Sequence, residues 1–238
     1  MRWASASDTH TGNVRQRNED AVLCSGDSGL WLVADGMGGH NAGEYASEVI
    51  AQTLSEVTLT NDLSDCVDAI EDRLLEANDH LRQHARMHCD GATVGSTVVV
   101  MVERADVGVV LWAGDSRLYL YRDGQLNVVT RDHNPIADHY DSGGVTEQEV
   151  LEADTNIVTR AVGGQRDLHL DVAAFPVHQG DVILLCSDGL YRDLSPSELS
   201  SALEKDVDLA VDELMSTCLS RSAKDNVSLV VARAGGRR

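Results

Sequence analysis

The chain has 238 residues, enough for one large domain with a hydrophobic core of its own. Its 39 acidic residues outnumber 19 basic ones, and the formal charge of −20 gives a surface that repels both nucleic acid and anionic membranes. We therefore expect no nucleic-acid or membrane partner. A site for an anionic substrate in such a chain needs bound cations to attract it.

The cysteine pattern and the N-terminus point to the cytoplasm. The five cysteines are odd in number, widely spaced and never in a CxxC pair, so they predict neither a disulfide framework nor a zinc site. The N-terminus has no apolar leader segment, and no later stretch reaches the roughly 18 consecutive apolar residues that a membrane helix needs. We expect a cytoplasmic protein with reduced thiols.

Helix and strand patterns follow one another without a linker or an internal repeat. Apolar residues recur at helical spacing over 41–57, 62–88 and 207–219, and Ser195 opens a capping box that starts a further short helix. Several strand patterns are too close together for helical crossovers, so the sheets should be largely antiparallel. The predicted strands are 20–24, 30–34, 96–102, 107–113, 117–121, 125–129, 181–186 and 227–232.

Two connections between these elements are informative. Asp123-Gly124 has a strand pattern on each side and is typical of a two-residue hairpin turn. Residues 132–167 contain only one short helical signal, at 146–149. Connections of that length are usually functional lids or disordered segments.

Acidic residues fall at the ends of the predicted strands. Buried strands lying side by side would gather these carboxylates at one edge of the sheets, where repulsion and desolvation are severe unless cations bind. Oxygen ligands without cysteine or a repeated histidine spacing favour Mg²⁺ or Mn²⁺ over zinc. The residues concerned are Glu19, Asp20, Asp35, Asp115, Asp188 and Asp225.

Two of these carboxylates are followed by glycine, and Asp-Gly taken alone is more often a turn than a ligand site. Unlike Asp123-Gly124, however, neither Asp35-Gly36 nor Asp188-Gly189 precedes a strand pattern, and both lead into helical patterns. A glycine after a ligand also lets the main-chain carbonyl turn toward the same ion. The combination favours a site for hard cations.

Six motifs follow one another along almost the whole chain: Gly12-x-x-Arg15-x-x-Asn18-Glu19-Asp20, Val33-Ala34-Asp35-Gly36-Met37-Gly38-Gly39-His40, Gly95-Ser96-Thr97, Ala113-Gly114-Asp115-Ser116-Arg117, Ser187-Asp188-Gly189-Leu190 and Lys224-Asp225-Asn226-Val227. In this order they resemble the motif series of the bacterial PP2C-like (PPM) phosphatases. The resemblance implies an α+β fold, a four-layer α-β-β-α sandwich of two mainly antiparallel β-sheets flanked by helices. We expect one domain over residues 1–238, a variable flap at about 132–168 that influences substrate choice, and a monomer.

The same resemblance implies a metal-dependent serine/threonine protein phosphatase with two Mn²⁺ or Mg²⁺ ions. A water that bridges two such ions has its pKa lowered from about 15.7 toward neutrality and would attack phosphorus in line. The residues implied as ligands are Asp35, which bridges the ions, the Gly36 carbonyl, Asp188, Asp225, Glu19 and Asp20 directly or through water, and Asp115 at a third, weaker ion.

Arginine is the residue expected to bind the substrate phosphate, because its planar guanidinium can bind two phosphate oxygens at once. The residues alone leave Arg15 and Arg17 undecided, and a surface salt bridge from Arg15 to Glu19 is the structural alternative. The motif register selects Arg15.

Two positions depart from the family pattern. Met37 stands where some eukaryotic relatives have a histidine as a proposed general acid, so protonation of the leaving group would fall to a metal-bound water. His40, His133 and His139 are substitutes, although a lone loop histidine is usually just solvated. Arg192 stands where many bacterial members have an acidic residue, so the third ion depends on whether its side chain points inward or to solvent.

The expected substrates are phosphoserine and phosphothreonine proteins of a bacterial serine/threonine kinase pathway. A metal-dependent phosphodiesterase could use the same carboxylates, but the charge of −20 argues against a polyanionic polymer as substrate. A pseudophosphatase that only binds phosphoproteins is the other alternative. It is less favoured because the ligands for two ions and Arg15 are all present.

Overall fold

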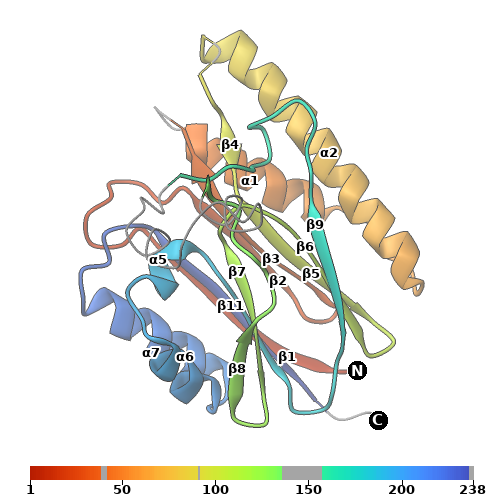
Figure 1. The fold of residues 1–238 in the computed structure, drawn as a ribbon, viewed down its shortest axis with the longest axis vertical. Helices are drawn as coiled ribbons and strands as arrows, with labels where there is room; N and C mark the ends of the chain where they lie inside the picture. The colour runs from red at the N-terminus through yellow and green to blue at the C-terminus, as the bar shows by residue number, and fades with distance from the viewer. Residues whose placement is uncertain (39–41, 91, 136–156, 236–238) are drawn as a thin grey trace.

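The computed structural model describes residues 1–38, 42–90, 92–135 and 157–235, which form two β-sheets packed face to face with helices on both outer faces (Figure 1). The elements in chain order are β1 (Trp3–His10), β2 (Asp20–Ser25), β3 (Leu30–Met37), α1 (Ala42–Ser55), α2 (Leu63–His88), β4 (Gly95–Ser96), β5 (Val98–Arg104), β6 (Val107–Ala113), β7 (Arg117–Arg122), β8 (Gln125–Val128), β9 (Asp171–Pro176), β10 (Val182–Cys186), α5 (Asp188–Tyr191), α6 (Pro196–Leu203), α7 (Val207–Leu219) and β11 (Val227–Ala234).

One sheet has the strand order β1-β11-β10-β7-β8, and the other has the order β2-β3-β5-β6-β9 with β4 paired to β3. Every strand pair within the described residues is antiparallel. Helices α6 and α7 cover the first sheet, and α1 and α2 cover the second (Figure 1). The predicted α+β sandwich with two antiparallel sheets and flanking helices is confirmed.

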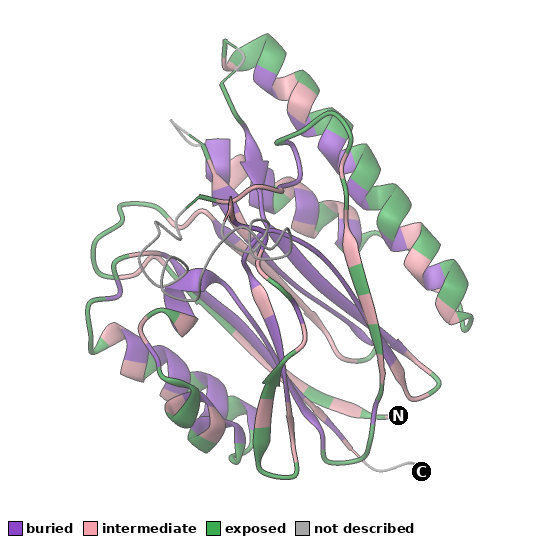
Figure 2. Cartoon of the chain, viewed as in Figure 1, coloured by how far each residue is buried: buried purple, intermediate pink, exposed green. Residues whose placement is uncertain are grey.

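The central strands are apolar on both faces because each sheet lies between a helical layer and the other sheet. Successive side chains of a strand point to opposite faces. In β3, Leu32 and Ala34 therefore pack toward α1 and α2, while Trp31 and Val33 pack between the sheets. Strand β10 divides its side chains in the same way between α6 and α7 and the space between the sheets. Figure 2 shows the buried strands enclosed between outer surfaces that are more exposed.

The structure adds elements that the sequence patterns did not predict. Strands β1 and β9 lie at sheet edges, and their partly exposed side chains leave no continuous apolar run. Strand β3 continues to Met37, so Asp35 lies within the strand and not after its end. The single strand predicted at 96–102 is divided into β4 and β5, and a short helix, α5, begins at Asp188.

Two expectations from the sequence concern a short helix and membrane-spanning segments. The helical signal at 146–149 falls on residues that the structure does not describe. Among the residues it does describe, none of the helices is both long enough and apolar enough to cross a membrane.

Candidate active site

The hairpin of β2 and β3 brings the first acidic residues together. Its register places Asp20 opposite Asp35, and the Gly36 N–H donates to the Glu19 carbonyl at 2.9 Å. A Cβ atom on Gly36 would lie 2.1 Å from the Gly43 carbonyl oxygen and 2.5 Å from that of Glu19. Glycine is therefore required here for space, because it lets the start of α1 and the Glu19 segment approach β3.

Helix α5 and the start of β11 bring the next pair together. Asp188 is the first residue of α5, and Asp225 lies two residues before β11. A Cβ atom on Gly189 would lie only 2.0 Å from the Asn226 carbonyl oxygen. The missing side chain at Gly189 thus allows α5 to pack against the segment that carries Asp225.

Asn226 fixes the loop that carries Arg15. Its side-chain oxygen accepts a hydrogen bond from the Glu19 N–H at 2.8 Å, and its amide group donates to the carbonyls of Thr11 and Arg17 at 2.9 and 2.8 Å. Sequence reasoning placed Asn226 in a motif but gave it no role. Its position beside Asp225 was the only available signal.

Thr97 joins Asp35 to the segment that carries Asp115. The Asp35 N–H donates to the Thr97 hydroxyl at 3.1 Å, and the Thr97 N–H donates to the Asp35 carbonyl at 2.8 Å. The hydroxyls of Thr97 and Ser116 share a hydrogen bond of 2.7 Å, and both residues are buried. These hydrogen bonds thus join the segments that carry Asp35 and Asp115, a contact to which sequence reasoning gave no role.

These segments enclose a cavity of about 340 Å³. Asp20 is not among its lining residues, and its buried carboxylate accepts a hydrogen bond from the Ser187 hydroxyl at 2.9 Å. The predicted site residues that line the cavity are Arg15, Glu19, Asp35, Gly36, Asp115, Asp188 and Asp225, and Arg192 and Met37 lie beside them.

Four carboxylates in or beside this site, those of Asp20, Asp35, Asp115 and Asp188, are largely withdrawn from water and repel one another. Burial raises the pKa of Asp20 and of Asp115 to about 7, and it raises the pKa of Asp35 well above its usual range, with Asp20 and Asp188 adding to the effect. Burial also raises the pKa of Asp188. One buried oxygen of Asp20 and one of Asp188, the Oδ1 atom in each, have no hydrogen-bond partner. Such a set of oxygen donors fits hard divalent ions, Mg²⁺ or Mn²⁺.

Two guanidinium groups pair with three of these carboxylates. Arg15 donates from Nε and Nη2 to both oxygens of Asp225, at 2.9 and 2.8 Å. Arg192 Nη2 lies 3.0 Å from an oxygen of Asp188 and 3.5 Å from one of Asp115. The described ranges contain no group of three or more His, Cys, Asp or Glu residues already arranged to hold an ion directly. Because Arg192 lines the cavity and pairs with Asp188 and Asp115, its side chain points into the site.

The two candidate arginines for phosphate binding differ in position. Arg15 lines the cavity and pairs with Asp225, so the alternative of a salt bridge to Glu19 is replaced by one within the site. Arg17 pairs with Glu44 at 3.4 Å and is not among the lining residues.

Of the three candidate histidines, only His133 lies in the described residues. It is buried, its Nδ1 accepts a hydrogen bond from the Gly114 N–H at 3.0 Å, and its Nε2 lies 3.2 Å from Asp171. His133 does not line the cavity. His40 and His139 lie outside the described residues.

The base of the predicted flap is fixed beside Asp115. Arg117 donates to both oxygens of Asp132 at 2.8 and 2.7 Å, and the His133 N–H donates to the Gly114 carbonyl at 2.9 Å. At the other end, the Thr159 N–H donates to the His133 carbonyl at 2.9 Å. We call this last hydrogen bond the flap stem, and it joins both ends of the segment next to the site.

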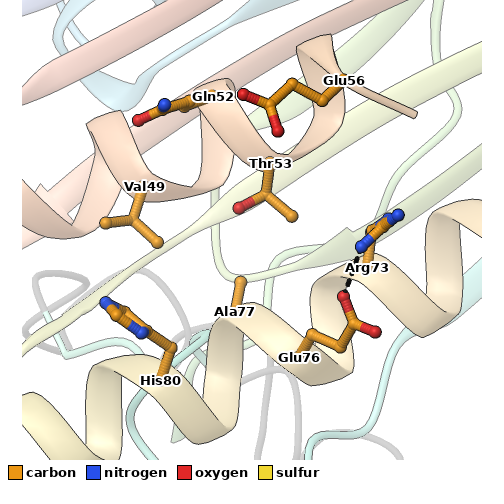
Figure 3. A pocket seen from close by; sticks show the side chains of 8 residues that line it. All are labelled: Val49, Gln52, Thr53, Glu56, Arg73, Glu76, Ala77 and His80. Atoms are coloured by element: carbon orange, nitrogen blue, oxygen red, sulfur yellow. Dashed lines mark hydrogen bonds and ion pairs between the residues drawn. The ribbon is translucent and has the colours of Figure 1, made fainter.

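A second cavity, of about 380 Å³, lies between α1 and α2 (Figure 3). Its charged lining residues include Arg73 and Glu76, which form an ion pair at 2.7 Å, together with Glu56. It is slightly larger than the carboxylate cavity but has no comparable cluster of buried charge. Its chemistry therefore gives no reason to place the reaction there.

The family model described as protein phosphatase 2C matches residues 8–230. The chain belongs to the protein phosphatase 2C family. It is 30% identical to the serine/threonine protein phosphatase PstP of Mycobacterium tuberculosis over 98% of its own length, and it spans 45% of PstP. It is 28% identical to the serine/threonine phosphatase Stp of Listeria monocytogenes, with 94% of this chain and 92% of that protein covered.

Solved structures of relatives have the same fold as this family member. PppA, a key regulatory component of T6SS in Pseudomonas aeruginosa, matches with a TM-score of 0.91 and 40% identity, over 98% of each chain. The catalytic domain of PstP in complex with two manganese ions matches with a TM-score of 0.86 and 29% identity, over 98% of this chain and 99% of that one.

Proposed function

We propose that this chain is a metal-dependent protein serine/threonine phosphatase that hydrolyses phosphoserine and phosphothreonine, with residues 1–238 as one phosphatase domain. The observation that carries the proposal is a single cavity in which carboxylates from separate elements meet Arg15, in a chain of the protein phosphatase 2C family. The relatives PstP and Stp are named serine/threonine phosphatases, which supports this function over a phosphodiesterase or a pseudophosphatase.

Two Mn²⁺ or Mg²⁺ ions would be held by the oxygen donors of the cavity, as the PstP catalytic domain holds two manganese ions. When bound, such ions supply Lewis acidity and a water of lowered pKa for attack on phosphorus. The proposed ligands are Asp35, the Gly36 carbonyl, Asp188 and Asp225, which line the cavity, with Glu19 and Asp20 acting directly or through water.

Arg15 would bind the phosphate of the substrate. Its side chain is 55% exposed, and its pair with Asp225 uses only part of its N–H donors, so it can take phosphate oxygens without leaving the site. We propose that the leaving serine or threonine oxygen takes its proton from water, since no histidine, cysteine or lysine is among the described residues that line the cavity.

The partners would be phosphorylated proteins of a serine/threonine kinase pathway, met by a monomer in the cytoplasm. All five cysteines are free thiols, which suits a reducing compartment. A narrower candidate is regulation of a T6SS, because the identity to PppA is 40% against 30% for PstP. Deleting the gene and comparing phosphoproteomes would test both: phosphosites that rise on T6SS components favour the narrower function, and sites confined to other proteins contradict it.

The activity test uses phosphoserine and phosphothreonine peptides with added Mn²⁺ or Mg²⁺. We expect turnover that stops with EDTA, and a phosphodiester at equal concentration should be hydrolysed far more slowly. Robust turnover in chelator would contradict the proposal, and binding of phosphopeptide without turnover would identify a pseudophosphatase.

The Arg15→Ala variant tests the phosphate site, with Arg17→Ala as its matched control. Both side chains are similarly exposed and each pairs with one carboxylate, but only Arg15 lines the cavity. Arg15→Ala should raise KM for the phosphopeptide roughly tenfold or more, and it should weaken inhibition by free phosphate. A larger loss in Arg17→Ala would show that the phosphate lies elsewhere.

A further inference from the structure

Arg192 is held at one end of the cavity by two carboxylates that are shielded from water. Its Nη2 atom lies 3.0 Å from Asp188 Oδ2 and 3.5 Å from Asp115 Oδ2. The Asp188 and Asp115 side chains are only 12% and 5% exposed, and that of Arg192 is 32% exposed. Ion pairs on an open surface contribute little to a structure, but here both carboxylates are nearly buried. Arg192 is thus part of the wall of the site.

Helix α5 builds this contact with consecutive residues. The Tyr191 hydroxyl donates to the Asp115 carbonyl at 3.1 Å, and the guanidinium of Arg117 lies 3.7 Å from the centre of the Tyr191 ring. Asp115 is therefore held at its carbonyl by Tyr191 and at its carboxylate by Arg192. Arg192, the C-cap of α5, thus pairs both with Asp188, the first residue of the helix, and with Asp115.

The two carboxylate oxygens of Asp188 have different surroundings. Its Oδ2 atom faces Arg192, while its Oδ1 atom is buried and has no hydrogen-bond partner. The ion pair with Arg192 therefore leaves one oxygen of Asp188 for a resident ion. Asp115 also presents its Oδ2 atom to the guanidinium of Arg192.

A divalent ion shared by Asp115 and Asp188 would need the position that Arg192 occupies. Such an ion binds carboxylate oxygens at about 2.0–2.6 Å, and Nη2 of Arg192 already lies 3.0 Å from Asp188 Oδ2 and 3.5 Å from Asp115 Oδ2. A guanidinium does not lose its proton in proteins, so its charge is permanent. That charge also repels a second cation placed beside it.

We propose that Arg192 takes the place of a divalent ion between Asp115 and Asp188, so that this chain holds two ions and not three. The inference rests on the proposed two-ion phosphatase. It makes Arg192 a positioning residue, which orients Asp188 and keeps a permanent positive charge beside Asp115.

Calorimetric Mn²⁺ titration of the whole chain tests this, with EDTA-treated protein as the starting state. Wild type should bind two ions, and Asp115→Asn should leave that number unchanged. Arg192→Met should bind one ion more, and the dissociation constant of that ion should rise roughly tenfold or more when Asp115→Asn is added. A third ion in wild type that depends on Asp115, or no additional ion in Arg192→Met, would overturn the proposal.

Two control variants keep the result interpretable. Arg192→Lys retains the positive charge and should still bind two ions, and Arg221→Met removes an arginine that pairs with Glu198 away from the cavity and should change nothing. If Arg192→Met does not fold, wild type and Asp115→Asn can still be compared, and a third ion that is present in wild type and lost in Asp115→Asn would overturn the proposal. Ion stoichiometry is read without substrate, so a chain that binds two ions but hydrolyses no phosphopeptide would refute the phosphatase and leave this inference standing.

Discussion

The Asp-Gly pairs at 35–36, 123–124 and 188–189 have the same sequence, but their glycines are required for two different structural reasons. At Asp123-Gly124 both residues have positive φ, 51° and 78°, and a Cβ on Gly124 would meet nothing within 4 Å. This glycine is needed for backbone conformation at the tip of a hairpin. At Gly36 and Gly189 an added Cβ would instead lie 2.1 and 2.0 Å from a backbone carbonyl oxygen. These glycines are needed because another segment lies against them.

The difference shows when an Asp-Gly pair indicates a functional site and when it indicates only a turn. A glycine at a hairpin tip leaves its aspartate in solvent, and Asp123 is exposed. A glycine chosen for close approach draws a second segment, with its own acidic residue, onto the first. Gly36 brings the Glu19 segment to Asp35, and Gly189 brings the Asp225 segment to Asp188.

The largest expected effect is a difference in phosphopeptide turnover between variants of Asp35 and Asp123. Asp35→Asn should reduce phosphopeptide turnover to background, whereas Asp123→Asn should retain the wild-type rate, because only Asp35 lies among the cavity carboxylates. Asp35→Asn should also raise the melting temperature in EDTA, since it removes one of several buried charges that repel each other. Near-wild-type turnover of Asp35→Asn would remove this residue from the proposed centre.

A smaller effect separates the glycines. Gly189→Ala should lower the free energy of unfolding by about 3 kcal/mol, because the new methyl group meets backbone that cannot move aside. Gly124→Ala should lower it by about 1 kcal/mol, the cost of a left-handed conformation in open space. Urea unfolding of both variants measures the two values. Equal losses would mean that Gly189, like Gly124, serves only backbone conformation.

The smallest effect concerns pH in the presence of EDTA. The pKa of Asp20 and Asp115 is about 7 in the folded chain, against 3.8 for an ordinary aspartate. A carboxyl group with a raised pKa contributes stability that is present below about pH 4 and is lost as pH rises through about 7. The melting temperature should therefore fall across this window.

Three comparisons test whether the buried cavity carboxylates cause this decline in melting temperature. Mn²⁺ should flatten the decline in melting temperature, Asp115→Asn should reduce it, and Asp123→Asn should leave it unchanged because Asp123 lies exposed at the hairpin tip. A decline that persists unchanged in Asp115→Asn and with Mn²⁺ would assign it to groups outside the cavity.

The sequence predicted the central strands and most cavity residues because both depend on burial. Strands such as β3 and β10, covered on both faces, must be continuously apolar, and acidic residues at their ends then become conspicuous. The edge strands β1 and β9 escaped prediction because they are covered less completely and carry mixed side chains.

Contacts between distant segments were beyond sequence reasoning. The hydrogen bonds of Thr97 and Asn226 join residues that are far apart in the chain. No local sequence pattern predicts which partner a threonine or asparagine will bind. The direction of Arg192 was equally undetermined, because it depends on α5 beginning at Asp188 and on the position of Asp115. The separation of Asp20 from the cavity lining follows from its contact with Ser187, which sequence spacing does not reveal.

The flap stem has a consequence for protein engineering. Because the Thr159 N–H donates to the His133 carbonyl, the described residues at the two ends of the intervening segment lie together. Lengthening a loop whose ends are already closed adds little entropic cost, about 0.6 kcal/mol for each doubling of its length. Residues 134–158 could therefore be exchanged at the stem for the corresponding segment of a relative; because Val158 lines the carboxylate cavity, it should be kept when the effect of the exchange on substrate preference is measured.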